Sequence, residues 1–276
     1  MVSARSLTVA LIAALTALAC ATSPTGRRQL NLFPQGQMQA MGVQAFQELK
    51  EETPTVDEGP VVRYVSCVSD AITAEVRRRS APESWEVTVF GSEQVNAFAL
   101  PGGKIGVYTG LLKVAENQHQ LAAVIGHEVG HVLADHSNER LSTNYAAQTG
   151  VTLLSVLAGA SGAVDRNTAM GLLGLGAQVG VVLPFSRLHE SEADRIGLDL
   201  MAEAGFDPRE SVNLWRNMAE AGGKGPPEFL STHPSRQTRI NDLQKWMPQA
   251  VNLYEVAQAR GRTPDCPRPA EIPADG

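Results

Sequence analysis

Residues 123–134 read Ala-Val-Ile-Gly-His-Glu-Val-Gly-His-Val-Leu-Ala, and the fold must be built around this stretch. Its apolar residues predict a buried helix. Residues four apart share a helix face, so His127 and His131 can direct two imidazoles at one Zn²⁺ ion. Glu128 flanks that face and can reach a metal-bound water without binding the metal, which is the position of a general base. The alternative, two unrelated core histidines, would bury three polar groups without partners at a high cost.

A catalytic zinc site needs a third protein ligand and an open position for water. The metzincin pattern requires a glycine and a histidine where this chain has Ala134 and Ser137, so that class of metallopeptidase is excluded. His136 lies nine residues after His127, about half a turn around a continuous helix. We therefore expect His136 to point away from the metal and to act as a structural hydrogen-bonding residue.

A later helix, predicted over 188–204, offers carboxylates as ligands. Glu190 and Asp194 are four residues apart and share a face. Glu190 can bind the metal while Asp194 accepts a hydrogen bond from the outer nitrogen of a ligand histidine. Glu192 points elsewhere and is expected to be solvated or structural. His189 is the rival third ligand.

The remaining periodicity predicts a mainly helical α+β domain. Alternating residues indicate a three-stranded β-meander, with a turn at Pro101-Gly102-Gly103. The expected strands are Trp85–Phe90, Val95–Leu100 and Lys104–Thr109. The expected helices cover residues 37–52, 61–79, 111–116, 118–136, 188–204, 209–221, 235–246 and 249–260.

The stretch Thr149–Leu183 consists almost wholly of glycine, alanine, leucine and valine, interrupted by Asp165-Arg166-Asn167. Each half is shorter than the roughly 20 residues of a membrane-spanning helix. These lengths favour a buried helical hairpin. A membrane hairpin, and a mobile lid or contact surface over the site, stay open as alternatives.

The N-terminus has the pattern of a targeting segment. Arg5 precedes the apolar run Leu7–Ala19, which is too short for an ordinary membrane span. The run ends at Cys20 in a sequence that resembles a bacterial lipobox, which predicts lipidation of Cys20. Ala17 stands where leucine is usual, and an ordinary signal peptide is the alternative. The expected organisation is a signal peptide 1–19, a lipid-anchored linker 20–35, a metal-binding domain 36–260 and a Pro-rich tail 261–276.

Export implies an oxidising compartment, where disulfides persist. Beyond Cys20 the chain has only Cys67 and Cys266. We expect these two to pair and to tie the tail to an early helix; two unpaired thiols are the alternative.

Composition and charge indicate the size of the domain and argue against one class of partner. The 276 residues are 43% hydrophobic, enough for one sizeable domain. The formal charge of −6 is spread along the chain, and the absence of a basic stripe disfavours a nucleic-acid partner.

The motifs together resemble the zinc metallopeptidase family of HtpX and the CAAX prenyl endopeptidases. The run Glu190–Gly197, following the metal-helix motif, is the most specific part, and Asn96–Gly103, Tyr108–Leu112 and Thr232-His233-Pro234 agree with it. Thr25–Leu30 is similar to the family's periplasmic lipoprotein members. The membrane-embedded members carry several long spans that are not found here, so their prenyl-protein substrate does not transfer.

The resemblance implies a gluzincin fold, mainly helical α+β, with a small antiparallel sheet beside the active-site helix. It implies one Zn²⁺ per chain, bound by His127, His131 and Glu190, with Glu128 as the base. Asp194 is expected to support a ligand histidine.

Two later residues have several expected roles. His233 can stabilise the developing oxyanion, bind zinc in a latent state, or cap the helix at Ser235. Arg239 can orient this wall or Asp194, or form an ordinary surface ion pair.

The strand Val95–Leu100 is the candidate edge for the substrate. Asn96, Ala97 and Phe98 would pair with a peptide through main-chain groups, which gives broad sequence tolerance.

The resemblance thus implies a zinc-dependent endopeptidase that cleaves misfolded or unassembled envelope proteins. It would face the periplasm, attached through its N-terminal lipid. Ala21 lacks the acidic residue associated with inner-membrane retention, which favours the outer membrane. The alternative function is a zinc-containing chaperone or assembly factor for outer-membrane proteins, with little or no proteolysis.

Overall fold

The computed structural model describes residues 20–76, 82, 84–156, 185–221, 228–233 and 236–272. The expected signal peptide and residues 157–183 of the glycine- and alanine-rich stretch lie outside these ranges. The three interpretations of that stretch therefore stay predictions. Within the described ranges, no helix is both long and apolar enough to cross a membrane.

The described chain is mainly helical, which confirms the predicted α+β, zincin-like class. The helices are α2 (Gln35–Glu52), α3 (Pro60–Val76), α4 (Thr109–Val114), α5 (Gln118–Leu133), α6 (His136–Val156), α8 (Arg187–Glu203), α9 (Glu210–Glu220), α10 (Glu228–Thr232) and α11 (Arg236–Ala259).

Helix α11 runs through Pro248, so the predicted break between two C-terminal helices is wrong. Proline removes one backbone hydrogen bond and costs about 3 kcal/mol inside a helix. Leu243 and Ala250, on either side of it, are both buried. Their burial against the core offsets that cost and keeps the helix continuous.

A four-stranded sheet lies beside α5. It comprises β3 (Thr55–Val56), β4 (Glu86–Phe90), β5 (Ala97–Leu100) and β6 (Lys104–Tyr108) in the order β3-β4-β6-β5. The predicted β-meander is wrong, because β4 pairs in parallel with β6 while β5 pairs antiparallel with β6 and lies at the sheet edge.

The central place of β6 has a steric reason. A Cβ at Gly106 would lie 2.2 Å from the Phe98 ring and 2.9 Å from the Phe90 ring. Only a glycine on β6 lets these two aromatic side chains, from the strands on either side, pack over it. The turn from β5 to β6 is where the sequence predicted it, with positive φ at Gly102 and Gly103.

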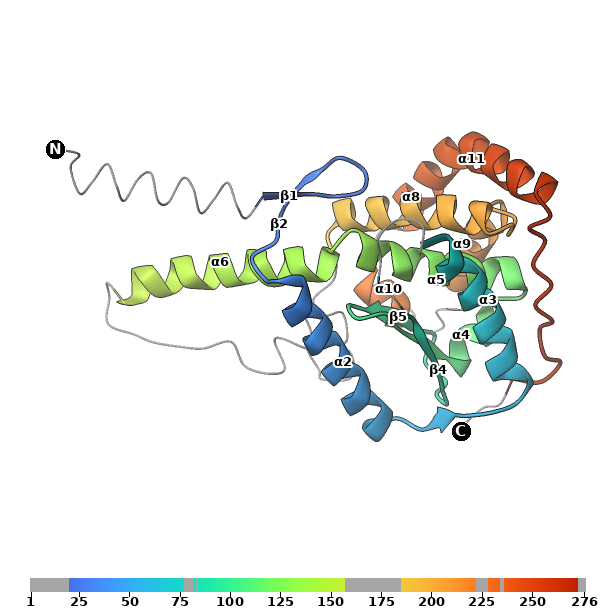
Figure 1. Ribbon diagram of the computed structural model, residues 1–276, viewed down its shortest axis with the longest axis horizontal. Coiled ribbons are helices and arrows are strands. Elements are labelled where there is room, and N and C mark those ends of the chain that lie inside the picture. The colour runs from blue at the N-terminus through green and yellow to red at the C-terminus, as the bar shows by residue number, and fades with distance from the viewer. Residues whose placement is uncertain are drawn as a thin grey trace.

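Helix α5 lies between α8 on one side and β5 on the other (Figure 1). The contact with α8 depends on glycine. A Cβ at Gly126 or Gly130 would lie 2.8 Å from a backbone oxygen of α8, and one at Gly197 would lie 2.6 Å from the backbone nitrogen of His127. These positions let the two backbones approach closely and bring the first turns of α8 onto the histidine face of α5.

Residues of the expected linker are ordered into a small hairpin. Strands β1 (Cys20–Thr22) and β2 (Arg28–Leu30) pair antiparallel, and β2 packs against α6. The backbone N–H of Leu32 donates to Ser142 Oγ at 2.8 Å. The hairpin is therefore attached to the domain.

The C-terminal tail is fixed along α3 (Figure 1). Cys67 and Cys266 form a disulfide with their Cα atoms 5.7 Å apart. The Cys266 N–H donates to Gln118 Oε1 at 2.8 Å, and Arg262 pairs with Glu75 at 2.8 Å. The disulfide thus ties together residues 199 apart in sequence.

Replacing both Cys67 and Cys266 with serine should lower the free energy of unfolding by about 2–5 kcal/mol, because the disulfide restricts the unfolded chain over a long loop. Denaturant titration of both proteins measures the loss. Thiol counting on denatured, unreduced wild-type protein is the control. Two reactive thiols besides any at Cys20 would contradict the pairing.

Candidate metal centre

Four side chains from three parts of the chain converge on one point. His127 and His131 come from α5, Glu190 from the first turn of α8, and His233 from the segment after α10. Their donor atoms all lie within 4.8 Å of one another, and all four residues are buried. The structure thus brings together the three ligands that the resemblance implied and adds His233 to them.

The donor spacing is close to that of a tetrahedral zinc site, with three of the following four distances a few tenths of an ångström shorter. His127 Nε2 lies 3.0 Å from His131 Nε2 and 3.2 Å from His233 Nδ1. Glu190 Oε1 lies 3.0 Å from His233 Nδ1 and 3.5 Å from His131 Nε2. Zinc bonds of 2.0–2.2 Å in a tetrahedron separate their donors by about 3.3–3.6 Å.

The protonation of the two helix histidines suits a metal. Burial lowers the pKa of His127 to about 4, assisted by the charge of Arg239. Burial also lowers the pKa of His131, well below its usual value. Both rings are therefore neutral at pH 7, the form in which imidazole binds a metal.

Helices α5 and α8 are both capped at their N-terminal ends, which fixes the residue at which each helix begins and so the position of its ligands. The Asn117 side chain accepts hydrogen bonds from the first turn of α5, from the N–H groups of His119 and Gln120 at 3.0 Å each. Ser186 Oγ accepts from the N–H of His189 at 3.2 Å and caps α8. Glu190 follows in the first turn of α8, where the helix dipole favours a carboxylate.

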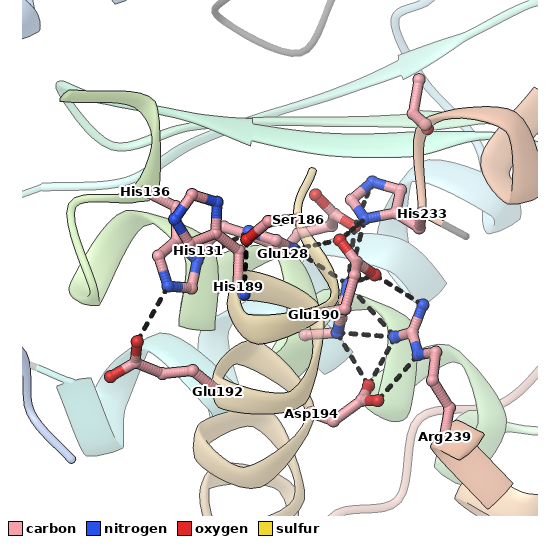
Figure 2. Close-up of polar contacts among 12 residues, drawn as sticks. Glu128, His131, His136, Ser186, His189, Glu190, Glu192, Asp194, His233 and Arg239 are labelled. Carbon is pink, nitrogen blue, oxygen red and sulfur yellow. Dashed lines mark hydrogen bonds and ion pairs between the residues drawn. The ribbon is translucent and has the colours of Figure 1, made fainter. Parts of the chain in front are cut away.

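The outer side of His127 is supported by Asp194, which is in turn held by Arg239. Figure 2 shows Arg239 reaching both Asp194 and Glu190. Asp194 Oδ1 lies 3.0 Å from His127 Nδ1. Arg239 Nε donates to Asp194 Oδ2 and Nη1 donates to Glu190 Oε2, both at 2.7 Å. Arg239 Nη2 is 2.9 Å from His127 Nδ1, but zinc on Nε2 leaves the proton on Nδ1, so Asp194 is its acceptor.

This support is buried, so Arg239 does not form a surface ion pair. Its side chain is 3% exposed, and its guanidinium lies 3.6 Å from the centre of the Trp215 ring. Burial alone would raise the pKa of Asp194, but the charge of Arg239 and the hydrogen bond with His127 hold it at about 2. Asp194 is thus ionised at neutral pH and can only accept hydrogen bonds.

Glu128 lies beside the four donors with one oxygen unused. Among the described residues its Oε1 is buried without a hydrogen-bond partner, and His233 Nε2 lies 3.5 Å away. Burial raises the pKa of Glu128 to about 7, although a hydrogen bond with the backbone of Ala99 counteracts this. Burying a carboxylate oxygen without a partner costs free energy unless a water or a substrate group donates a hydrogen bond to it. An oxygen available to a water in this way suits a general base.

His233 occupies the position that a catalytic site would keep open. Of its three expected roles, this position is compatible with the one in which His233 binds zinc in a latent state. The segment carrying it also reaches the sheet, because the Phe229 N–H donates to the Val95 carbonyl at 3.2 Å. Ser235 lies outside the described residues, so the capping role is not tested.

The candidate substrate strand is close to Glu128. Strand β5 lies at the sheet edge and packs against α5. The Ala97 N–H donates to Asn96 Oδ1 at 3.0 Å, and the Ala99 backbone bonds Glu128. The Phe98 ring packs among other aromatic rings in the core. Backbone groups of Ala97 and Ala99, with which a bound peptide would pair, are thus already hydrogen-bonded within the protein.

One expectation about the metal helix is wrong. Helix α5 ends at Leu133, and Asp135 has a φ of 52° before α6 begins at His136. Only on a continuous helix would His136 lie half a turn away from His127. The new direction puts His136 Nδ1 2.9 Å from His131 Nδ1, so His136 points toward the ligand and not away from it.

The other candidates on α8 are settled by their partners. Glu192 is buried, 3.2 Å from His136 and 2.8 Å from Arg27, so it is structural and not solvated. His189 Nε2 lies 3.0 Å from Glu139 Oε2 and is outside the four-donor group. Sequence reasoning missed Arg27, for which only its place in the Thr25–Leu30 motif was a signal.

Replacing Glu190 with alanine should reduce bound zinc well below one per chain, because it removes the only carboxylate among the four donors and leaves the buried Arg239 guanidinium without this partner beside the metal group. Metal analysis after dialysis measures it. The same substitution at Glu220, an exposed residue of α9, is the matched control and should keep full zinc. Full stoichiometry in Glu190→Ala would place the ligand elsewhere.

Comparisons with known proteins agree with this geometry. The family model described as "Peptidase family M48" matches residues 62–247. The mitochondrial metalloendopeptidase OMA1 of Schizosaccharomyces pombe is 38% identical over 209 residues, covering 75% of this chain and 57% of that protein. The OMA1 metalloendopeptidase of Danio rerio is 34% identical over 260 residues, 88% of this chain and 52% of that protein.

A bacterial relative has a different name. The beta-barrel assembly-enhancing protease of Escherichia coli strain K12 is 25% identical over 241 residues, which is 82% of this chain and 48% of that protein. The chain thus spans about half the length of these relatives.

Proposed function

Since the chain belongs to peptidase family M48, a family of zinc metallopeptidases, we propose that it is an endopeptidase that cleaves misfolded or unassembled proteins of the bacterial cell envelope. One observation carries this proposal. A buried group of donors with zinc spacing lies beside a glutamate that has an unused oxygen.

In the proposed hydrolysis, the residues of the metal centre have different roles. A zinc ion held by His127, His131 and Glu190 would polarise the scissile carbonyl and lower the pKa of water. Glu128 takes the proton of the attacking water and passes it to the leaving amine. Asp194 holds the Nδ1 proton of His127, so that Nε2 faces the metal.

His233 and its segment must move before a substrate can enter. His233 fills the fourth donor position, and the Phe229 N–H donates a hydrogen bond to the Val95 carbonyl, next to β5. Release of this segment would free both at once. A peptide could then pair along β5 through main-chain groups, which suits unfolded substrates of varied sequence.

A cavity beside the metal group offers room for substrate side chains. It has a volume of about 650 Å³ and is bordered by His131 and Asp135, by Met38 of α2, and by the turn at Pro101 and Gly102. Both polar and apolar side chains line it, so it would accept residues of mixed chemistry.

Several features support a place in the envelope. The lipobox-like sequence before Cys20 suits lipid anchoring at the outer membrane, facing the periplasm. The disulfide between Cys67 and Cys266 suits an oxidising compartment. The bacterial relative named for β-barrel assembly agrees, whereas the OMA1 relatives are named as mitochondrial. A position in the HtpX and prenyl-endopeptidase branch stays a prediction from the motifs.

The second candidate is a zinc-containing chaperone or assembly factor with little or no proteolysis. The closed four-donor arrangement favours it, since structural zinc sites have four protein ligands. The two functions differ in whether Glu128 is needed.

Replacing Glu128 with glutamine should reduce cleavage of unfolded casein by about 10²–10⁴-fold, the usual contribution of a general base. Zinc content should stay unchanged because Glu128 is not a ligand. Cleavage at the wild-type rate would reject the role of Glu128, and rescue of a deletion phenotype by this variant would favour the chaperone.

Replacing His233 with alanine separates its two remaining roles. If His233 is a resting ligand, its removal leaves His127, His131 and Glu190 to hold the metal and opens the fourth position. Zinc should then be retained while casein cleavage rises. A group that stabilises the oxyanion would be lost with the ring, and cleavage would fall at unchanged zinc content. That second result would contradict the latent arrangement.

A further inference from the structure

The two helix histidines of the metal group are supported in different ways. His127 contacts a carboxylate directly, through Asp194. His131 instead contacts another imidazole, because its Nδ1 lies 2.9 Å from His136 Nδ1. His136 is fully buried and its Nε2 lies 3.2 Å from Glu192 Oε2. Figure 2 shows the two supports on opposite sides of α8.

The carboxylate fixes the proton positions along this chain of rings. Glu192 accepts from His136 Nε2, so the proton of the neutral His136 ring is on Nε2 and its Nδ1 is an acceptor. His136 Nδ1 can then accept only from a protonated His131 Nδ1. This leaves the lone pair of His131 on Nε2, the atom that faces the other metal donors.

Glu192 is in turn held by the N-terminal hairpin. Arg27 Nε donates to Glu192 Oε2 at 2.8 Å, and Thr25 Oγ donates to Glu192 Oε1. The same guanidinium donates to both oxygens of Glu139, at 2.7 and 2.6 Å. A paired guanidinium keeps a partly buried carboxylate charged and in one orientation.

We propose that the hairpin of β1 and β2 is part of the metal centre, with Arg27 as the positioning residue that sets the tautomer and orientation of His131 through Glu192 and His136. The hairpin begins at Cys20, so this connection joins the start of the described chain to a metal ligand 111 residues after it. The support of His127 has the same form. His127 contacts Asp194, which Arg239 holds, and His131 is connected through His136 to Glu192, which Arg27 holds.

The inference rests on zinc binding at the four-donor group, as the proposed function does, but not on peptidase activity. Neighbouring arginines provide a matched pair of variants. Arg27 reaches two carboxylates, whereas Arg28 of the same hairpin is exposed. Replacing either with glutamine removes the same charge from the same hairpin.

The test measures the dissociation constant of Zn²⁺ in full chains by competition with a chelating dye. Arg27→Gln should weaken zinc binding by about tenfold, the lower end of the loss seen when an outer partner of a metal ligand is removed. It should also change the visible spectrum of the Co²⁺-loaded protein, which reports ligand geometry. Arg28→Gln should match wild type in both.

Thermal unfolding of the metal-free proteins separates this role from folding. If Arg27→Gln lowers the metal-free melting temperature, Thr25→Val replaces it, since this change removes one hydrogen bond to Glu192 without changing the charge. Its expected loss of zinc affinity is smaller but in the same direction. Equal zinc affinity and equal Co²⁺ spectra in the wild type and the Arg27 or Thr25 variant would overturn the inference. Failure of the wild-type chain to bind zinc would reject the proposed function instead.

Discussion

The close contact between α5 and α8 is the constraint on which the metal centre depends. Gly126, Gly130 and Gly197 leave no room for a Cβ between the two backbones. At this distance Glu190 reaches the histidines, and Asp194 reaches the outer nitrogen of His127. A bulkier residue at any of the three positions would move α8 outward and separate the carboxylate ligand from the imidazoles. Small residues, more than the metal ligands themselves, therefore set the geometry of the site.

Burying this many polar groups is tolerable because nearly every one has a partner. Arg239 joins Asp194 to Glu190, and Arg27 joins Glu192 to Glu139. The two guanidinium groups lie on the outer ends of the supports and compensate the carboxylates. Among the four donor residues and Glu128, the Oε1 atom of Glu128 is buried without a hydrogen-bond partner, and it is the oxygen that the reaction needs free. The pattern is that of a site whose supporting groups are fixed and whose base is left available.

The sequence predicted those parts of the site that follow from helix spacing. His127, His131, Glu190 and Asp194 are each four residues from a partner on the same helix, and a helix face is a local property. The turn at Asp135 carries no glycine or proline, so nothing in the sequence indicated that α5 ends before His136. The parallel pairing of β4 with β6 depends on rings from β4 and β5 that pack over Gly106, which the alternation of residues within each single strand does not indicate. The link from Arg27 to Glu192 spans 165 residues, and the Thr25–Leu30 motif that contains Arg27 did not indicate its partner.

Zinc K-edge X-ray absorption on the zinc-loaded resting protein tests the central claim most directly, because it counts imidazole ligands without substrate or activity. The four-donor arrangement predicts three imidazoles and one carboxylate oxygen at about 2.0–2.2 Å, with no sulfur. In the His233→Ala variant the imidazole count should fall to two. A resting spectrum that shows only two imidazoles, with water in the remaining position, would contradict the arrangement in which His233 closes the site.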